Sequence, residues 1–123
     1  MSIFEHSKTF PREEVFSLTD QVRRSSRSVC ANLAEAWCKR RYEKVFISKL
    51  SDVESEAAET QVWLEFATAC GYLPSESTKS LYAMYGEILR MIFTMITHPE
   101  QWVINPDRAT IHEEPNEYTF SEL

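Results

Sequence analysis

Residues 42–72, YEKVFISKLSDVESEAAETQVWLEFATACGY, decide the fold that the sequence predicts. One set of positions there recurs every three or four residues: Phe46, Leu50, Val53, Ala57, Gln61, Leu64, Ala67 and Gly71. This spacing predicts one helix with a nearly heptad apolar stripe that is interrupted by a polar residue at Gln61. Gly71 and Pro74 then end the helix, because glycine readily turns left-handed and proline cannot continue the helix. Trp63 and Phe66 lie off the stripe and indicate a second buried face, against another helix or another subunit.

Two further helices are predicted on either side of this one. Residues 12–37 repeat apolar positions at helical spacing, and Pro11 with Glu13 and Glu14 favours a helix start there, capped by Thr9. Residues 75–97 repeat them again and stop before His98 and Pro99. Long helices with short connections predict an all-α, up-and-down antiparallel bundle over residues 1–98. Residues 99–123 hold six acids and one base and predict an extended or partly ordered tail, in which Trp102, Val103 and Ile104 are candidates for docking on the bundle or on a neighbouring molecule.

Composition excludes several classes of protein. With 123 residues, 43% of them hydrophobic, the chain fits one globular domain that needs no disulfide or metal to fold. The three cysteines lack metal-type spacing and the three histidines are scattered, so we expect buried free thiols and neither metal nor cofactor. No apolar run approaches the ~20 residues of a membrane span, and residues 1–10 do not resemble a signal peptide. We therefore expect a cytoplasmic protein without membrane contact.

Charge is distributed unevenly along the chain. The net charge is −6, yet residues 22–49 hold eight bases against Glu35 and Glu43. Arginine and lysine side chains suit phosphate oxygens, so Lys39, Arg40, Arg41 and Arg27 are candidate contacts for nucleic acid. The alternative for most of these bases is a solvated face with ion pairs to the neighbouring acidic helix. We favour that alternative, because the protein is acidic and no aromatic residues interleave, except for residues 39–41 at an expected turn.

A set of polar residues on the first long helix predicts a structural network. Asn32 and Glu35 are three residues apart on one helical face, and buried polar groups need hydrogen-bond partners. We expect Glu35 to pair with Arg24 or Arg27, in a network between helices or subunits made of Arg24, Ser28, Asn32, Glu35 and Glu59. Catalysis would need a further acid, base or metal, and a di-iron bundle would need Glu-x-x-His pairs that the sequence lacks. The sequence therefore predicts a protein that is not an enzyme.

Several landmarks carry a resemblance to a known family: Phe10-Pro11, Glu14, Leu18, Gln21, Arg24, Ser28, Asn32 to Glu35, Phe46, Leu50, Glu59, Leu64, Ala67 and Gly71-Tyr72. In these residues the chain resembles the bacterial four-helix-bundle family first noticed as proteins encoded in intervening sequences of 23S ribosomal RNA genes. That family also includes the accessory protein of diversity-generating retroelements. Three features depart from it. Ala36 replaces a usual glycine, and usual small residues in the middle of the long helix are replaced by Val53, Ser55 and Glu56. Only nine residues precede Phe10, where the family's first helix would lie. Either the chain starts late or another element replaces that helix.

The resemblance implies a helical bundle that assembles into a ring-like homopentamer and has no known enzymatic activity. In the retroelement branch it implies binding to a reverse transcriptase and to nucleic acid through a basic surface. We therefore hold two hypotheses: a non-enzymatic oligomeric scaffold or binding module, and an accessory protein that binds RNA or DNA around Lys39–Arg41.

Overall fold

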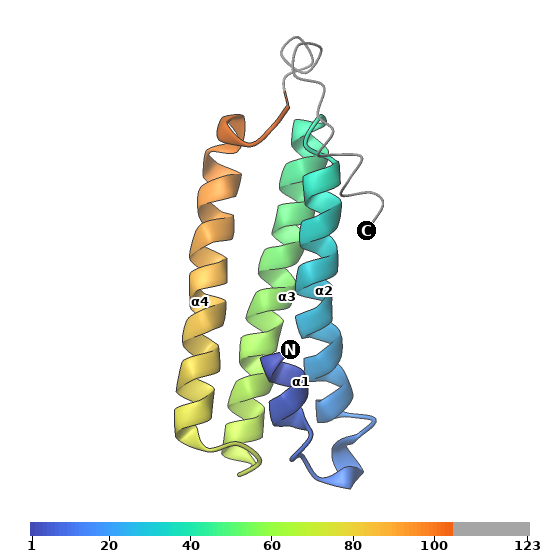
Figure 1. Ribbon diagram of the computed structural model, residues 1–123, viewed down its shortest axis with the longest axis vertical. Coiled ribbons are helices and arrows are strands. Elements are labelled where there is room, and N and C mark those ends of the chain that lie inside the picture. The colour runs from blue at the N-terminus through green and yellow to red at the C-terminus, as the bar shows by residue number, and fades with distance from the viewer. Residues whose placement is uncertain (105–123) are drawn as a thin grey trace.

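The computed structural model describes residues 1–104, and all regular structure among them is helical. Three long helices, α2 (Leu18–Cys38), α3 (Glu43–Ala69) and α4 (Ser75–Thr97), run up, down and up side by side (Figure 1). A short helix, α1 (Ser2–Ser7), lies against the lower end of this layer, and 3-10 turns occupy Arg12–Glu14 and Pro99–Gln101. The all-α prediction is confirmed. The expected tail falls mostly on residues 105–123, outside the described part of the chain.

Helix α2 begins at Leu18, so the predicted helix start at Pro11 is wrong. Residues Arg12–Glu14 form a separate 3-10 turn. The Glu14 carboxylate accepts hydrogen bonds from the Leu18 N–H at 3.4 Å, from the Ser17 hydroxyl and from the Tyr72 phenol at 2.7 Å. Because this carboxylate satisfies one of the unpaired N–H groups that open α2, the chain enters the helix at Leu18.

The apolar stripe of α3 is confirmed at six positions, all less than 2% exposed: Phe46, Leu50, Val53, Ala57, Leu64 and Ala67. The polar position of the stripe was predicted wrongly at Gln61. Thr60 is fully buried, whereas Gln61 is half-buried and its amide donates to the Tyr82 carbonyl at 3.1 Å. The stripe steps from Ala57 to Thr60 and then to Leu64, which keeps it on one side of a helix with 3.6 residues per turn.

The predicted end of α3 at Gly71 is confirmed. Gly71 has φ +78°, the left-handed conformation that glycine adopts without penalty. The Tyr72 N–H bonds to the Ala67 carbonyl at 2.8 Å and the Gly71 N–H to the Thr68 carbonyl at 3.0 Å. This pair of bonds is a Schellman motif, which closes the helix and turns the chain toward α4.

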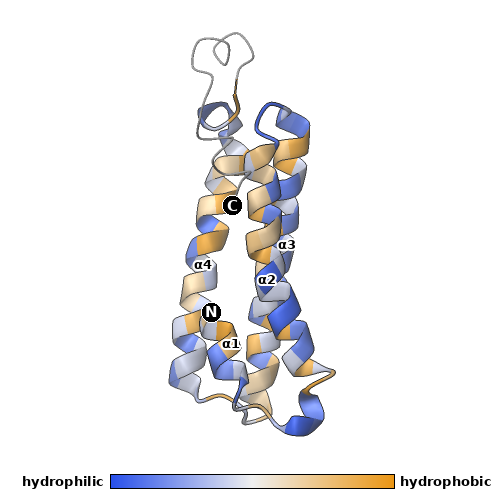
Figure 2. Ribbon diagram, turned by 45° about the vertical axis from the view of Figure 1, so that its right-hand side comes forward, coloured by the Kyte–Doolittle hydropathy of each residue, from blue (hydrophilic) through white to orange (hydrophobic). Residues whose placement is uncertain are grey.

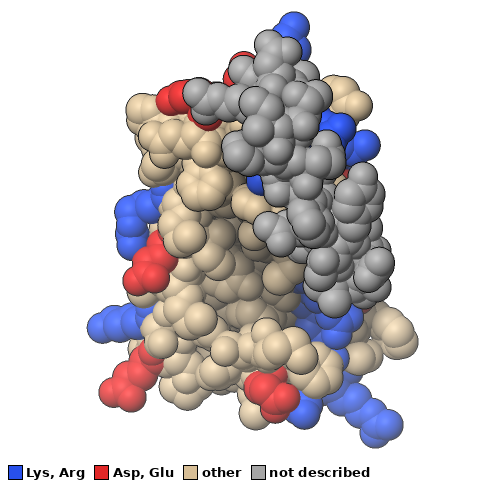
Figure 3. Space-filling view, turned by 45° about the horizontal axis from the view of Figure 1, so that its top comes forward, with Lys and Arg blue, Asp and Glu red and all other residues tan. Residues whose placement is uncertain are grey.

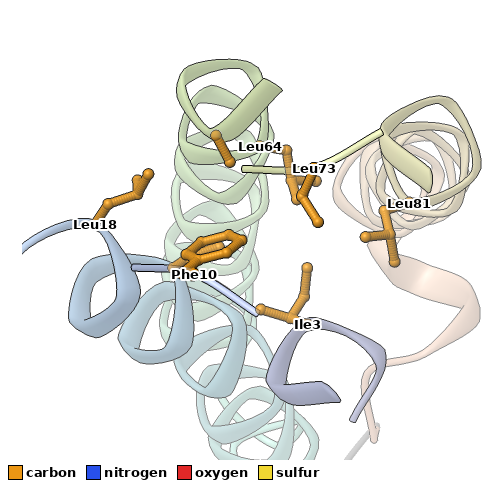
Figure 4. Close-up of a cluster of buried hydrophobic side chains, with 8 residues drawn as sticks. Ile3, Phe10, Leu18, Leu64, Leu73 and Leu81 are labelled. Atoms are coloured by element: carbon orange, nitrogen blue, oxygen red, sulfur yellow. The ribbon is translucent and has the colours of Figure 1, made fainter. Parts of the chain in front are cut away.

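Two hydrophobic clusters fill the layer, one at each end. The lower cluster joins α1, the 3-10 region and the three long helices through Ile3, Phe10, Leu18, Val22, Leu64, Ala67, Leu73 and Leu81 (Figure 4). The upper cluster joins only the three long helices, through Val29, Ala36, Phe46, Leu50, Val53, Ala57 and Ile92. Between the clusters, the buried Thr60 hydroxyl lies 2.8 Å from that of Ser25 and links α3 to α2.

Residues 98–104 fold back across the upper end of the bundle. Trp102 and Val103 pack against the upper cluster, as predicted, and the Trp102 ring meets Trp37 edge-on at 6.5 Å between centroids. The Ile104 N–H donates to the Arg40 carbonyl at 2.9 Å. The chain is thereby fixed to the turn between α2 and α3.

Several predicted buried side chains lie at the surface instead. Cys30, Cys38 and Cys70 are free, as expected, but all three are exposed, because each falls outside the packed side of its helix. Phe66 is 53% exposed, although Trp63 beside it packs against the lower cluster. Val62, Tyr82 and Met91 are exposed as well, and Figure 2 shows apolar residues along all three long helices. The second face that Trp63 and Phe66 indicated is therefore only partly covered within one chain.

Candidate functional site

The basic turn, Lys39–Arg41, connects α2 to α3 at the upper end of the bundle. Lys39 and Arg41 are exposed and Arg40 is half-buried. The Arg40 guanidinium lies 3.7 Å from the centre of the Trp37 ring, and its Nε donates to the Trp37 carbonyl at 2.9 Å. Three cations just beyond the C-terminal end of α2 also suit the negative end of its dipole. The expected turn therefore exists, and it holds one arginine in a fixed position against an aromatic ring.

Arg27 does not belong to the basic turn. It lies 13 residues before Arg40, or about 20 Å along the axis at 1.5 Å per residue. The structure places it with Arg23 and Arg24 around a shallow hollow on the side of α2, which exposed Val15 and Phe16 also line. The four predicted nucleic-acid contacts therefore divide into three at the turn and one on the helix.

The predicted polar network divides as well. The Arg24 guanidinium pairs with the carboxylates of Glu56, at 3.3 Å, and of Glu59. Glu59 also accepts from the Trp63 indole N–H at 3.1 Å. Arg24 and Glu59 therefore join α2 to α3, although the Arg24 side chain is 46% exposed and such pairs contribute little to stability.

The other network residues do not reach Arg24. The Asn32 side-chain amide donates to the Ser28 hydroxyl at 3.1 Å and to the Ser28 carbonyl at 3.0 Å, within α2. Glu35 pairs with Lys49 at 2.7 Å, so the predicted pairing with Arg24 or Arg27 is wrong. The hydrogen bond and the charge of Glu35 raise the pKa of Lys49. Asn32 is only half-buried and Glu35 is exposed, so these contacts lie on the surface and not in the core.

The sequence did not predict three contacts: the pairing of Glu35 with Lys49, the hydrogen bond between Glu14 and Tyr72, and the contact between Ser25 and Thr60. A signal for two of these was present in the chain. In an antiparallel helix pair, residues equally far from the connecting turn lie opposite each other. Glu35 and Lys49 are equally far from Tyr42, and Ser25 and Thr60 differ by one position, so the α2–α3 register follows once the turn is placed. No local pattern could show that Glu14 meets Tyr72.

Among residues 1–104, no three His, Cys, Asp or Glu side chains gather closely enough to hold a metal ion. The hydrogen bond to Glu14 raises the phenol pKa of Tyr72 to about 12. That pair closes the lower end of the bundle. None of the helices within residues 1–104 has the length and apolar character needed to cross a membrane.

Comparisons with known proteins agree with the fold. A family model, that of the 23S rRNA-intervening sequence protein, matches residues 1–94, which include all four helices except the last turn of α4. No curated protein and no solved structure matches the chain significantly. The matched range ends before the segment that crosses the upper end of the bundle. It covers most of the chain, and on that ground the protein belongs to the family of 23S rRNA-intervening sequence proteins.

Proposed function

We propose that this protein is a non-enzymatic, oligomeric helical bundle that serves as a scaffold or binding module. The observation that carries this proposal is the amount of apolar surface left outside a single chain. Phe16 is 92% exposed, Phe93 60% and Phe66 53%. Extended apolar patches on a folded protein mark surfaces that another molecule covers.

Two of these side chains form a patch, which we call the Phe16–Phe66 patch. Both line a hollow at the seam of α2 and α3, together with Leu18, Trp63 and Cys70. The Trp63 and Phe66 rings lie 5.7 Å apart. Covering each phenylalanine would contribute about 1.5–3 kcal/mol. Such a patch suits a contact between copies, for which the resemblance noted above implies five subunits.

Light scattering during gel filtration tests this proposal. We expect wild type to elute as an assembly of five, and the double variant Phe16→Ser with Phe66→Ser to dissociate toward monomers. Ser55→Glu, an exposed change on α3, serves as the matched control and should leave the assembly intact. A wild-type monomer at tens of micromolar would refute the proposal.

A second candidate function is binding of RNA or DNA by the basic turn. The observation that favours it is the run of Lys39, Arg40 and Arg41 at one end of the bundle, with Trp37 beside Arg40. Cations contact phosphates, and a neighbouring aromatic ring can stack on an unpaired base.

A salt titration of binding to single-stranded RNA distinguishes this function. Each phosphate contact contributes about 0.7 to the slope of log affinity against log salt, so changing residues 39–41 to alanine should lower that slope by about 2. Lys79→Ala with Arg90→Ala, both on exposed parts of α4, provides the control and should leave the slope unchanged. Arg27→Ala shows separately whether the RNA extends along α2. Absence of binding at low salt would exclude this function.

A further inference from the structure

Helix α1 covers only the lower part of the space between α2 and α4. At 1.5 Å per residue, its six residues span about 9 Å, whereas the 21 residues of α2 span about 32 Å. Figure 1 shows α1 against the lower end of the layer, and Figure 2 shows it between the lower halves of α4 and α2. We call the space above α1, between α2 and α4, the upper slot.

One wall of the upper slot is a face of α4. Helical spacing puts four residues on that face: Met84, Ile88, Met91 and Met95. Ile88 and Met95 pack against the upper cluster, whereas Met84 is 49% and Met91 66% exposed. This wall is therefore apolar and only partly covered. Three of its four side chains are methionines, whose flexible, unbranched chains can adapt to another apolar surface.

The opposite wall is a face of α2. The same spacing puts Ser26, Cys30, Leu33 and Trp37 there. Leu33 is 37% exposed and Cys30 is exposed. Burial raises the pKa of Tyr85 on α4, and the nearby Cys30 raises it further. Cys30 therefore lies close to Tyr85, so this face of α2 is turned toward α4. Figure 3 shows the uncovered part of this side of the molecule as a hollow whose middle is lined by uncharged residues.

Helix α1 shows how the lower part of the same space holds a helix. Its Ile3 side chain is 5% exposed and points into the lower cluster, toward Leu73 and Leu81 (Figure 4). At the next position, the Phe4 ring lies beside two arginines of α2. The distances from its centre to the guanidinium carbons of Arg23 and Arg27 are 4.4 and 5.9 Å. The seat of α1 thus holds an aliphatic side chain on the side that faces the core. On the side that faces the arginines of α2, it holds an electron-rich aromatic ring.

The upper slot continues this interface with the same chemistry. Arg27 lies one turn above Arg23 on α2 and is exposed. Among residues 1–104, neither arginine has a carboxylate within ion-pair distance, whereas Arg24 has two. The arginine edge of the slot therefore carries two guanidinium groups without an ion pair among residues 1–104, and Asp20 is the one acid that lines the same hollow.

We propose that the upper slot binds one amphipathic α-helix of a partner protein, with its apolar stripe between α2 and α4 and its acidic flank toward Arg27. The slot is bounded on both sides by helices and continues the seat of α1, so a helix matches its shape. From Arg27 to Ala36, below the place where Trp102 meets Trp37, it offers about 15 Å, which corresponds to a partner helix of about three turns. This partner surface is separate from the Phe16–Phe66 patch, and it adjoins the basic turn at Trp37.

A designed peptide serves as the probe. It is a fluorescein-labelled, helix-forming 15-mer with leucine at every third or fourth position and glutamate on one flank, and its binding to the full chain is measured by fluorescence anisotropy. We expect micromolar binding, and at least tenfold weaker binding of an otherwise identical peptide with lysine in place of glutamate.

Protein variants locate the site. Met91→Glu and Leu33→Glu put a charge on either wall at positions that are already exposed, and each should weaken binding at least tenfold. Thr94→Glu is the matched control: it introduces the same charge on α4, at an exposed position that lines a hollow on the other flank together with Glu54 of α3. It should change the affinity less than twofold. Circular dichroism confirms that all three variants fold.

Four results would overturn the proposal. The first is no binding at 100 micromolar peptide, and the second is equal affinity for the glutamate and lysine peptides. The third is that Met91→Glu reduces the number of subunits measured by light scattering, because a second copy would then occupy the slot. The fourth is displacement of the probe by a synthetic peptide of residues 105–123, because this chain would then supply the occupant itself.

Discussion

The hydroxyl pair between α2 and α3 gives the most direct test of how the two helices are held in register. Ser25 and Thr60 are each 0% exposed, and their hydroxyl oxygens lie 2.8 Å apart. Each hydroxyl has a second partner within its own helix. Thr60 Oγ1 donates to the Glu56 carbonyl at 2.8 Å, whereas Ser25 Oγ reaches the Val22 carbonyl only at 3.4 Å.

This asymmetry sets the expected magnitudes. Thr60→Val keeps the side-chain shape but leaves the Ser25 hydroxyl with only its long bond, so we expect a loss of about 1–3 kcal/mol in the free energy of unfolding. Ser25→Ala leaves Thr60 with a good partner and should cost less, about 0.5–1 kcal/mol. The double variant removes both polar groups and should be no less stable than Thr60→Val alone. The coupling free energy should therefore be about 1 kcal/mol.

Chemical denaturation followed by circular dichroism measures all four proteins. One fixed protein concentration is used, because association changes the apparent stability. Thr94→Val is the matched control: its hydroxyl makes the same bond to the carbonyl four residues earlier, at 3.0 Å, but on an exposed part of α4. It should change stability by less than about 0.5 kcal/mol. Additive effects of the two core changes, within about 0.3 kcal/mol, would show that the pair does not couple the helices.

Three further predictions concern the core, the end of α3 and the lower end of the bundle. Phe46→Ala, at a fully buried position in the upper cluster, should lower the free energy of unfolding by about 3–5 kcal/mol in the same denaturation assay. Gly71→Ala should cost about 1–2 kcal/mol, although no atom lies within 4 Å of the added methyl group, because the backbone there has φ +78°; an unchanged midpoint would contradict this. Tyr72 ionises near 10 when unfolded and at about 12 in the folded protein, because Glu14 accepts its hydrogen bond, so stability should fall as pH rises between those values. Tyr72→Phe should remove that part of the fall. Absorbance of the phenolates during titration should show one late-ionising tyrosine fewer than in wild type, because Tyr85, whose pKa is also raised, remains.

The helices themselves were largely predictable from the sequence. The stripe of α3 is long and regular, and Gly71 with Pro74 marks an unambiguous end, so the helix and its stop were both confirmed. The start of α2 was misplaced because Pro11 with acids beside it resembles a helix start. The true start depends on the Glu14 carboxylate. One of the three groups that donate to this carboxylate is the Tyr72 hydroxyl, which follows the C-terminal end of α3.

The candidate site shows the same division. Lys39–Arg41 was correctly placed on a turn, because a break in the apolar pattern is visible in the chain. The pairing of Glu35 with Lys49 was not foreseen, because both Arg24 and Arg27 are possible partners until the register of α2 and α3 is known.

The sequence by itself determined that the chain forms long helices, which faces they bury and where α3 ends. These properties depend on residue spacing and local backbone preference, which act within a few residues of each other. Only the tertiary structure decided which carboxylate each arginine meets, that the three thiols lie outside, and that α1 fills only part of the space between α2 and α4. Those outcomes depend on contacts between residues distant in the chain, and the register of the packed helices sets them.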